Sequence, residues 1–156
     1  MNTYCYSALN QIKIALMKTI EIMEKLDETD LQKRPSPDKH SIGELLEHLA
    51  SICRADLLIA NGATQGELNQ FYSSIEYGSL NEIKTGILHN FQLLEECYLN
   101  YSEEELQVKI TSFWGVTYSR YEWLLEILAH VYHHRGQLHA ILVHCYDKDP
   151  KVLLFE

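Results

Sequence analysis

Apolar side chains recur every third or fourth residue in four long segments of this sequence. That spacing lines one face of an α-helix with side chains that need a core. The last segment is apolar on nearly every side, which is typical of a central helix. No internal repeat and no alternation of strands with helices accompanies the pattern. We therefore expect an all-α, four-helix bundle with helices over about 7–27, 41–61, 80–98 and 119–144.

The predicted helix ends carry local signals. Two prolines in the run KRPSPD, from Lys33, prevent the first helix from continuing. Ser41 is placed to cap the second helix, and Glu44, three residues on, completes a capping box. Ser119 and Glu122 repeat that pattern where the fourth helix is expected to begin.

Two connections, 61–79 and 102–118, exceed the usual length of a turn between bundle helices. Connections of this length can cross over a bundle or cover a site. The second one contains Phe113, Trp114 and Tyr118, which are equally suited to roof a site or to plug the core.

The charge balance argues against nucleic acid and membranes as partners. Thirteen Lys and Arg face 22 Asp and Glu, a formal net charge of −9, and such a surface repels phosphate backbones and anionic lipid. No apolar run approaches the roughly 20 residues of a membrane span, and the N-terminus has no secretory pattern. The four cysteines form no CxxC pair, so we expect reduced thiols. These features predict one cytoplasmic domain over residues 1–156.

Two histidines interrupt the apolar fourth segment at a spacing that suits a metal ion. His130 and His134 are four residues apart, so on a helix they stack with Cβ atoms about 5–6 Å apart. His48 borders the apolar stripe of the second helix, and a bundle core can bring a ligand from one helix against a pair on another. Three neutral imidazoles leave coordination positions open, which is typical of a catalytic ion.

Another interpretation of the same residues needs no metal. His48 can be a core histidine bonded to a backbone carbonyl, with the other two as polar positions at the edge of the core. The chain would then be a metal-free helical interaction protein. Spacing alone leaves both interpretations open.

Motifs in the second and fourth helices resemble those of the DinB/YfiT-like superfamily of metalloenzymes, and the similarity extends over essentially the whole chain. The motifs are SIGELLEHLA, from Ser41, and HVYHHRGQL, from His130. The resemblance implies a four-helix bundle with a long crossover between the second and third helices, and a homodimer. It also implies one divalent ion, nickel or zinc, held by His48, His130 and His134. The position before Ser41 is often Trp in relatives and is His40 here.

Two further residues are candidates to support the site without binding the ion. Gln137, three residues beyond His134, can orient a ligand or make a helix-packing hydrogen bond. Glu44, four residues before His48, can support the site or act as a general base, in addition to its capping role. His133 projects about 100° away around the helix and is not expected to bind the ion.

The remaining histidines and one glycine receive no role in the site. His40, His89, His139 and His144 share no spacing with the three and are predicted at the surface or an interface. Gly136 inside a helix costs about 1 kcal/mol relative to Ala, for which close approach of another helix is the usual compensation.

The resemblance implies two kinds of enzyme acting on a small molecule. Relatives include S-transferases that use a low-molecular-weight thiol, and metal-dependent hydrolases. We favour thiol transfer, because an open ion can hold a thiolate without a further acid–base residue, whereas a hydrolase would use Glu44 as its base. A non-catalytic alternative is a metal-stabilised, stress-related binding module. Imidazole accepts nickel and zinc alike, so the sequence does not select the metal or any catalytic residue.

Overall fold

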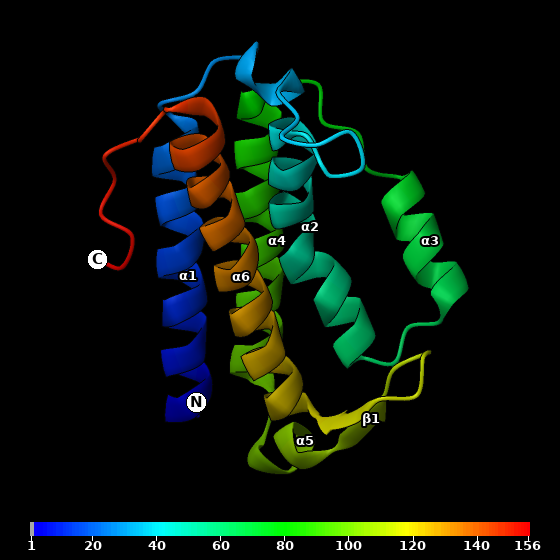
Figure 1. Ribbon diagram of the computed structural model, residues 1–156. Coiled ribbons are helices and arrows are strands. Elements are labelled where there is room, and N and C mark those ends of the chain that lie inside the picture. Colours follow the sequence, from blue (N-terminus) through cyan, green and yellow to red (C-terminus); the bar gives the residue numbers. More distant parts are fainter. Residues whose placement is uncertain (1) are drawn as a thin grey trace.

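Four long helices, α1, α2, α4 and α6, run the length of the molecule (Figure 1). A computed structural model describes residues 2–156, so Met1 of the predicted domain lies outside the described residues. The predicted helical bundle is confirmed, with short elements between its long helices. The elements in chain order are α1 (Thr3–Met23), the 3-10 helix η1 (Asp30–Gln32), α2 (Ile42–Ala60), α3 (Gln65–Ser73), α4 (Leu80–Asn100), α5 (Glu103–Gln107), β1 (Lys109–Thr111), β2 (Thr117–Ser119) and α6 (Arg120–Tyr146).

The directions of the helices explain the long connection between α2 and α4. In Figure 1, α1 and α6 rise from the end of the molecule that holds the N-terminus, whereas α2 and α4 descend toward it. α2 packs against α4 and α6, and α1 packs against the same two helices. Because α2 and α4 are neighbours that run in the same direction, the chain must return along the bundle between them, and α3 lies on that return path. The predicted crossover is confirmed.

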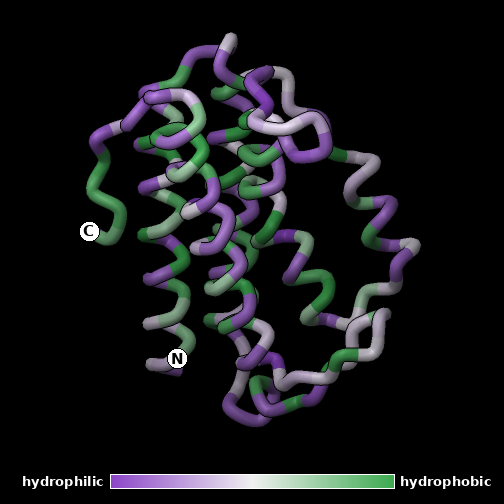
Figure 2. The backbone as a smooth tube through the Cα atoms, in the orientation of Figure 1, coloured by the Kyte–Doolittle hydropathy of each residue, from purple (hydrophilic) through white to green (hydrophobic). Residues whose placement is uncertain are grey.

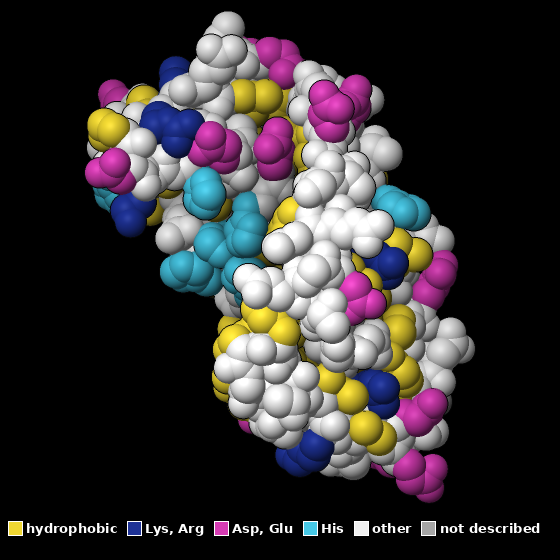
Figure 3. Space-filling view, turned by 90° about the vertical axis from the view of Figure 1, so that its right-hand side faces the viewer, with side chains coloured by type: hydrophobic (Ala, Val, Ile, Leu, Met, Phe, Trp, Pro, Cys, Tyr) yellow, Lys and Arg dark blue, Asp and Glu magenta, His cyan; other side chains and the backbone are white. Residues whose placement is uncertain are grey.

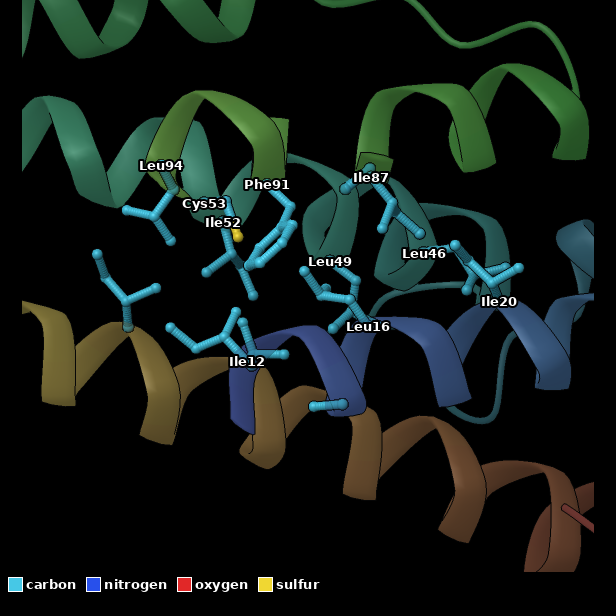
Figure 4. Close-up of a cluster of buried hydrophobic side chains, with 14 of the residues drawn as sticks. Ile12, Leu16, Ile20, Leu46, Leu49, Ile52, Cys53, Ile87, Phe91 and Leu94 are labelled. Carbon is cyan, nitrogen blue, oxygen red and sulfur yellow. The ribbon is translucent and has the colours of Figure 1, made fainter. Parts of the chain in front are cut away.

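The apolar stripes of the long helices meet in one core, while hydrophilic residues intersperse along their outer sides (Figure 2). Figure 4 shows Ile12 and Leu16 of α1 beside Leu49 and Ile52 of α2, with Phe91 of α4 next to them. All five side chains are at most 7% exposed. Burying a side chain of this size stabilises the fold by roughly 1.5–3 kcal/mol relative to leaving it exposed. This core fixes the position of α2 relative to its neighbours.

Two of the predicted caps are present where the sequence indicated them. The Ser41 hydroxyl accepts the backbone N–H of Glu44 at 3.1 Å, and the Glu44 carboxylate accepts the Ser41 N–H at 2.9 Å. α6 begins directly after Ser119, whose hydroxyl accepts the N–H of Glu122. A complete capping box therefore starts α2, whereas at α6 only the serine hydroxyl half of the predicted pattern is present.

α1 begins four residues earlier than predicted, over Thr3–Met23 instead of 7–27. The Asn2 side chain caps it by accepting two backbone N–H groups at 2.9 and 3.1 Å. At the other end, the Asp27 carboxylate accepts the N–H of Thr29 at 2.9 Å, which stabilises a turn instead of a further helical turn.

The connection between α1 and α2 packs closely on the start of α2. Ile42 donates its N–H to the carbonyl oxygen of Lys33 at 2.9 Å. A Cβ atom on Gly43 would lie 2.9 Å from the backbone oxygen of Leu31. Glycine at this position therefore permits η1 to lie directly against α2.

The two long connections contain structure that helical periodicity did not reveal. α3 buries only Leu68 and α5 only Leu106, so neither has an apolar stripe. Lys109–Thr111 pairs with Thr117–Ser119 as an antiparallel hairpin, and Gly115 adopts a φ of 96° in its turn. These elements are too short to show a period of apolar residues. α3 and the hairpin lie on the same side of the bundle (Figure 1).

Two expectations from composition can be compared with the structure. Within residues 2–156, no helix combines the length and the hydrophobicity needed to cross a membrane. All four cysteines are free, with Cys5 and Cys53 buried and Cys145 exposed, as expected for reduced thiols.

Candidate metal centre

Three histidines from two helices direct ring nitrogens at one another. His48 lies on α2, and His130 and His134 lie one turn apart on α6. The Nε2 atom of His48 is 3.2 Å from Nε2 of His130 and 3.1 Å from Nε2 of His134. Several histidine side chains form a patch on the face that carries α3, and another lies apart from that patch (Figure 3). Packing of α2 against α6 thus brings together the three residues that the sequence singled out.

The opposite ring nitrogens of the α6 pair are held by hydrogen bonds. Nδ1 of His130 is 2.7 Å from a carboxylate oxygen of Asp56, and Nδ1 of His134 is 2.7 Å from the amide oxygen of Gln137. Both oxygens accept, so both Nδ1 atoms carry the hydrogen. In the neutral imidazoles Nε2 is then a free lone pair, directed into the cluster. Gln137 thus has the orienting position considered from the sequence, and Asp56 is an additional residue of this kind.

This arrangement fits a cation better than a hydrogen-bonded trio. His48 can donate at most one hydrogen from Nε2, but it faces two lone pairs at 3.1 and 3.2 Å. One of the two contacts would therefore join two lone pairs. Ligands about 2.0–2.1 Å from zinc lie about 3.3 Å apart at a tetrahedral angle and about 2.9 Å apart at a right angle. The observed separations fall within that interval.

The protonation of the cluster also suits metal binding. Burial, followed by the nearby His134 and His130, lowers the pKa of His48 to about 4. Burial is also the main cause of the lowered pKa of His134. Burial opposes protonation of His130 too, but the hydrogen bond and charge of Asp56 outweigh it and raise the pKa. Neutral imidazole is the form that binds metal, so His130 is the residue at which protons compete most strongly.

An open cavity of about 410 Å³ lies in front of His48. A ligand held by the three nitrogens would therefore be reachable from solvent. The cavity is lined from α2, from α3 and from the segments beside them, by His40, Glu44, Glu47, His48, Ser51, Tyr72 and Ile75.

Comparison with known proteins identifies the family of the chain. The sequence profile of the DinB superfamily matches residues 11–138. This chain belongs to the DinB superfamily. No curated protein matches it.

Solved structures of DinB proteins have the same fold. A candidate member of the DinB family from Exiguobacterium sibiricum is 32% identical, with 94% of this chain and 95% of that chain covered and a TM-score of 0.80. The DinB-like protein YjoA from Bacillus subtilis is 18% identical, covers 85% and 87%, and has a TM-score of 0.65. A DinB-like protein from Bacillus cereus is 16% identical, covers 96% and 94%, and has a TM-score of 0.71.

The hydrogen-bond partners of Glu44 in this DinB chain make it poorly suited to act as a base. Its carboxylate forms two hydrogen bonds with Arg34, at 2.7 and 2.9 Å, in addition to the capping bond with Ser41. The bonds from Arg34 come first among the causes that lower the pKa of Glu44 to about 2. A carboxylate with so low a pKa is a poor proton acceptor at neutral pH. The structure thus favours the capping role over that of a base.

Glu47 is a cavity residue that the sequence analysis missed. Burial raises its pKa, and within residues 2–156 its carboxylate has no hydrogen bond or ion pair. It directly precedes His48, and the helical spacing gave no reason to separate it from the other acidic residues of α2.

His40 also has more contact with the site than predicted. Its side chain is 66% exposed, as expected of a surface residue, but its ring stacks on that of His48 with centroids 6.4 Å apart. His133 is exposed, and its ring meets the edge of the His134 ring at a centroid distance of 4.8 Å. It does not join the three converging nitrogens.

The expectation for Gly136 was wrong. Nothing would lie within 4 Å of a Cβ atom at this position, so no helix approaches it closely. The residue faces solvent on α6, and the structure gives no packing reason for glycine there.

Proposed function

We propose that this DinB chain is a divalent-metal-dependent enzyme whose ion, nickel or zinc, is held by His48, His130 and His134. The observation that carries the proposal is the convergence of three Nε2 atoms, two of them fixed as lone pairs by Asp56 and Gln137. All three ligands lie on long helices of the bundle, whose packing limits how far the ligands can move apart.

The chemistry follows from three neutral ligands beside an open cavity. A divalent cation held there supplies Lewis acidity, which stabilises a thiolate or acidifies water at neutral pH. We propose transfer of a low-molecular-weight thiol to a small electrophile: the thiol releases its proton to solvent, and the new carbon–sulfur bond forms as the leaving group departs with its electron pair. His48, His130 and His134 bring no negative charge, so the cation's charge remains available to the thiolate. The cavity of about 410 Å³ gives both reactants access.

Hydrolysis is a second candidate because Glu47 lines the same cavity as His48. Its raised pKa and unpaired carboxylate suit a base that takes a proton from attacking water. Glu44, which the sequence suggested for that role, is committed to Arg34. Thiol transfer needs no such base, so substitution of Glu47 separates the two reactions.

A metal-stabilised binding module without turnover is the non-catalytic alternative. It predicts that the ion changes the melting temperature but that no thiol and electrophile react in its presence. The homodimer and the cytoplasmic location expected from the sequence remain predictions.

Metal content tests the ligand set directly. Protein purified without a histidine tag would be measured by inductively coupled plasma mass spectrometry, as wild type, His134→Ala and His133→Ala. We expect about one equivalent of a transition metal in the wild type and in His133→Ala, and a loss in His134→Ala. His133 is the matched control because it is the adjacent histidine but lies outside the cluster. A wild type that holds no metal and refuses added zinc and nickel would refute the proposal.

Activity assays then distinguish the reactions. Metal-loaded protein would be given a low-molecular-weight thiol with a small electrophile, or small ester and amide substrates without thiol. Thiol transfer that survives in Glu47→Gln supports the first proposal. Hydrolysis that falls by about 10²-fold or more in this variant supports the second.

A further inference from the structure

A second cavity, separate from the one in front of His48, lies between α2, α6, α3 and the β-hairpin. Its volume is about 200 Å³, far more than the about 10–15 Å³ that one water needs. Aromatic rings form much of its wall, and its polar side chains are acidic apart from one histidine and one tyrosine. The residues that define its chemistry are Asp56, Tyr72, Trp114, Trp123, Glu126 and His130.

The aromatic walls present ring surfaces to the cavity. The rings of Trp114 and Trp123 meet edge to face, with centroids 6.2 Å apart. The indole N–H of Trp123 is already bonded to the carbonyl oxygen of Ile110 at 3.1 Å. This wall therefore offers aromatic rings to a ligand, but no free N–H from Trp123. Ring surfaces of this kind attract cations through their negative faces.

The two carboxylates dominate the charge of the cavity. Asp56 uses one carboxylate oxygen on His130, and no hydrogen bond to its other oxygen is present among residues 2–156. Glu126 has no hydrogen bond or ion pair within the same described part of the chain, and burial, followed by the charge of Asp56, raises its pKa. None of the described residues that line the cavity is a lysine or arginine. In the metal-free protein, an anion would therefore be repelled here, whereas a cation would be attracted.

An inorganic cation does not suit this cavity. Calcium needs six to eight oxygen ligands and magnesium near-octahedral oxygen geometry, whereas the cavity has two carboxylates and mainly carbon surfaces. Within residues 2–156, the one cluster with the spacing of a metal site is the three histidines. Aromatic rings with carboxylates match an ammonium group, which is large, weakly hydrated when alkylated, and singly charged.

We propose that this cavity binds the ammonium group of a small organic substrate, preferably an alkylated one. The part of this inference that concerns catalysis rests on the proposed function, whereas the binding of an ammonium group does not. Tyr72 lines both cavities, and His130 belongs to both the metal centre and the aromatic cavity. A molecule anchored by its ammonium group can extend past Tyr72 into the space in front of His48. The cavity thus selects which electrophile is presented to the metal centre.

Tryptophan fluorescence provides a direct test, because the chain has two tryptophans and both line this cavity. Choline would be titrated into chelator-treated protein and compared with the neutral alcohol in which carbon replaces its ammonium nitrogen. Sodium chloride at equal ionic strength corrects for salt. We expect a saturable change with choline, and binding of the neutral alcohol that is weaker by about fivefold or more.

Variants assign the binding to the cavity. Glu126→Gln should weaken choline binding about three- to tenfold, and Trp114→Ala should weaken it similarly while Trp123 remains as the reporter. Glu104→Gln is the matched control, since it removes one negative charge from exposed α5. Equal binding of choline and the neutral alcohol, or unchanged binding in Glu126→Gln, would overturn the proposal.

The same titration keeps the two proposals apart. Choline binding in chelator-treated His134→Ala, which is expected to lack metal, supports the cavity independently of the ion. A protein that binds zinc but shows no saturable response to choline would refute the ammonium cavity and leave the metal centre standing. A protein that binds choline but binds neither zinc nor nickel would support the ammonium cavity and refute the metal centre.

Discussion

The contact between Asp56 and His130 gives the sharpest prediction about the metal centre. Asp56→Asn replaces a carboxylate by an amide of nearly the same shape, 2.7 Å from Nδ1 of His130. The charge that favours electron donation from the imidazole is lost. In addition, the amide can present its NH₂ group to Nδ1, which moves the ring hydrogen to Nε2 and blocks the lone pair.

The magnitude follows from the type of hydrogen bond. A bond to a charged group contributes about 1.5–3 kcal/mol and a neutral one about 0.5–1.5 kcal/mol. The difference of about 1–1.5 kcal/mol corresponds to roughly a five- to tenfold change in affinity. Rearrangement of the tautomer adds to this, and partners of metal-bound histidines typically account for about 10–100-fold. We expect the zinc dissociation constant of Asp56→Asn to rise about 10–100-fold. Gln137→Leu, which removes a neutral bond, should raise it less, by about two- to tenfold.

Competition with a chromogenic chelator at fixed pH measures these dissociation constants. Glu104→Gln is the control for the loss of one unit of negative charge. In the metal-free proteins, nuclear magnetic resonance should show that the pKa of His130 is lower in Asp56→Asn than in the wild type, because Asp56 is the cause of its raised value. Zinc affinity equal to that of Glu104→Gln, together with an unchanged His130 pKa, would refute the assigned role of Asp56.

Three further predictions concern stability. The pKa of His48 is about 4 in the fold and about 6.5 when unfolded, so the unfolded chain binds more protons between these values and metal-free protein loses stability as the pH falls through them. Discounted for partial exposure, the loss is about 1–2 kcal/mol, measured by urea unfolding and absent from His48→Gln. Gly43→Ala should destabilise the fold by about 1–3 kcal/mol because the new Cβ atom meets the backbone of η1. Gly136→Ala, with nothing within 4 Å of the new Cβ atom, should stabilise the fold by up to about 1 kcal/mol. Thermal melting compares the two variants. Leu94→Ala, at a position 0% exposed, should cost about 2–5 kcal/mol in urea unfolding, and exposed Leu88→Ala less than about 1 kcal/mol.

The long helices could be predicted because each one buries a continuous stripe. Two starts followed from local chemistry: Ser41 and Ser119 precede helices whose third residue donates its N–H to the serine hydroxyl. Ser79 caps α4 in the same way, a signal that the sequence analysis did not use. α3 and the hairpin could not be predicted from an apolar stripe, although a capping box of Thr64 and Glu67 starts α3. α3 buries one residue, and the strands have three residues each, so their positions depend on contacts with the bundle and not on a period.

Helical spacing also revealed the candidate ligands on α6. Of the two residues that form hydrogen bonds with these ligands, the sequence analysis found Gln137 but not Asp56. His130, His134 and Gln137 lie within two turns of one helix, so helical geometry alone relates them. His48 is related to them only by the packing of α2 on α6 and was suggested by its place beside the apolar stripe and by family resemblance. Asp56 lies eight residues after His48, about two turns along α2, and this spacing was a usable signal.

The residues of the two cavities come partly from the bundle helices and partly from the long connections, which suggests how substrate specificity is set. The three histidines lie on α2 and α6, whose buried faces pack into the core, so their geometry depends on the bundle. Tyr72 and Trp114, in contrast, come from α3 and the hairpin, and both side chains are about half exposed. Substitutions in these two segments can therefore alter which molecule is bound without moving the ligand nitrogens. If both proposals hold, the bundle determines whether an ion is held, and the connections that helical periodicity failed to predict determine which molecule reaches the ion.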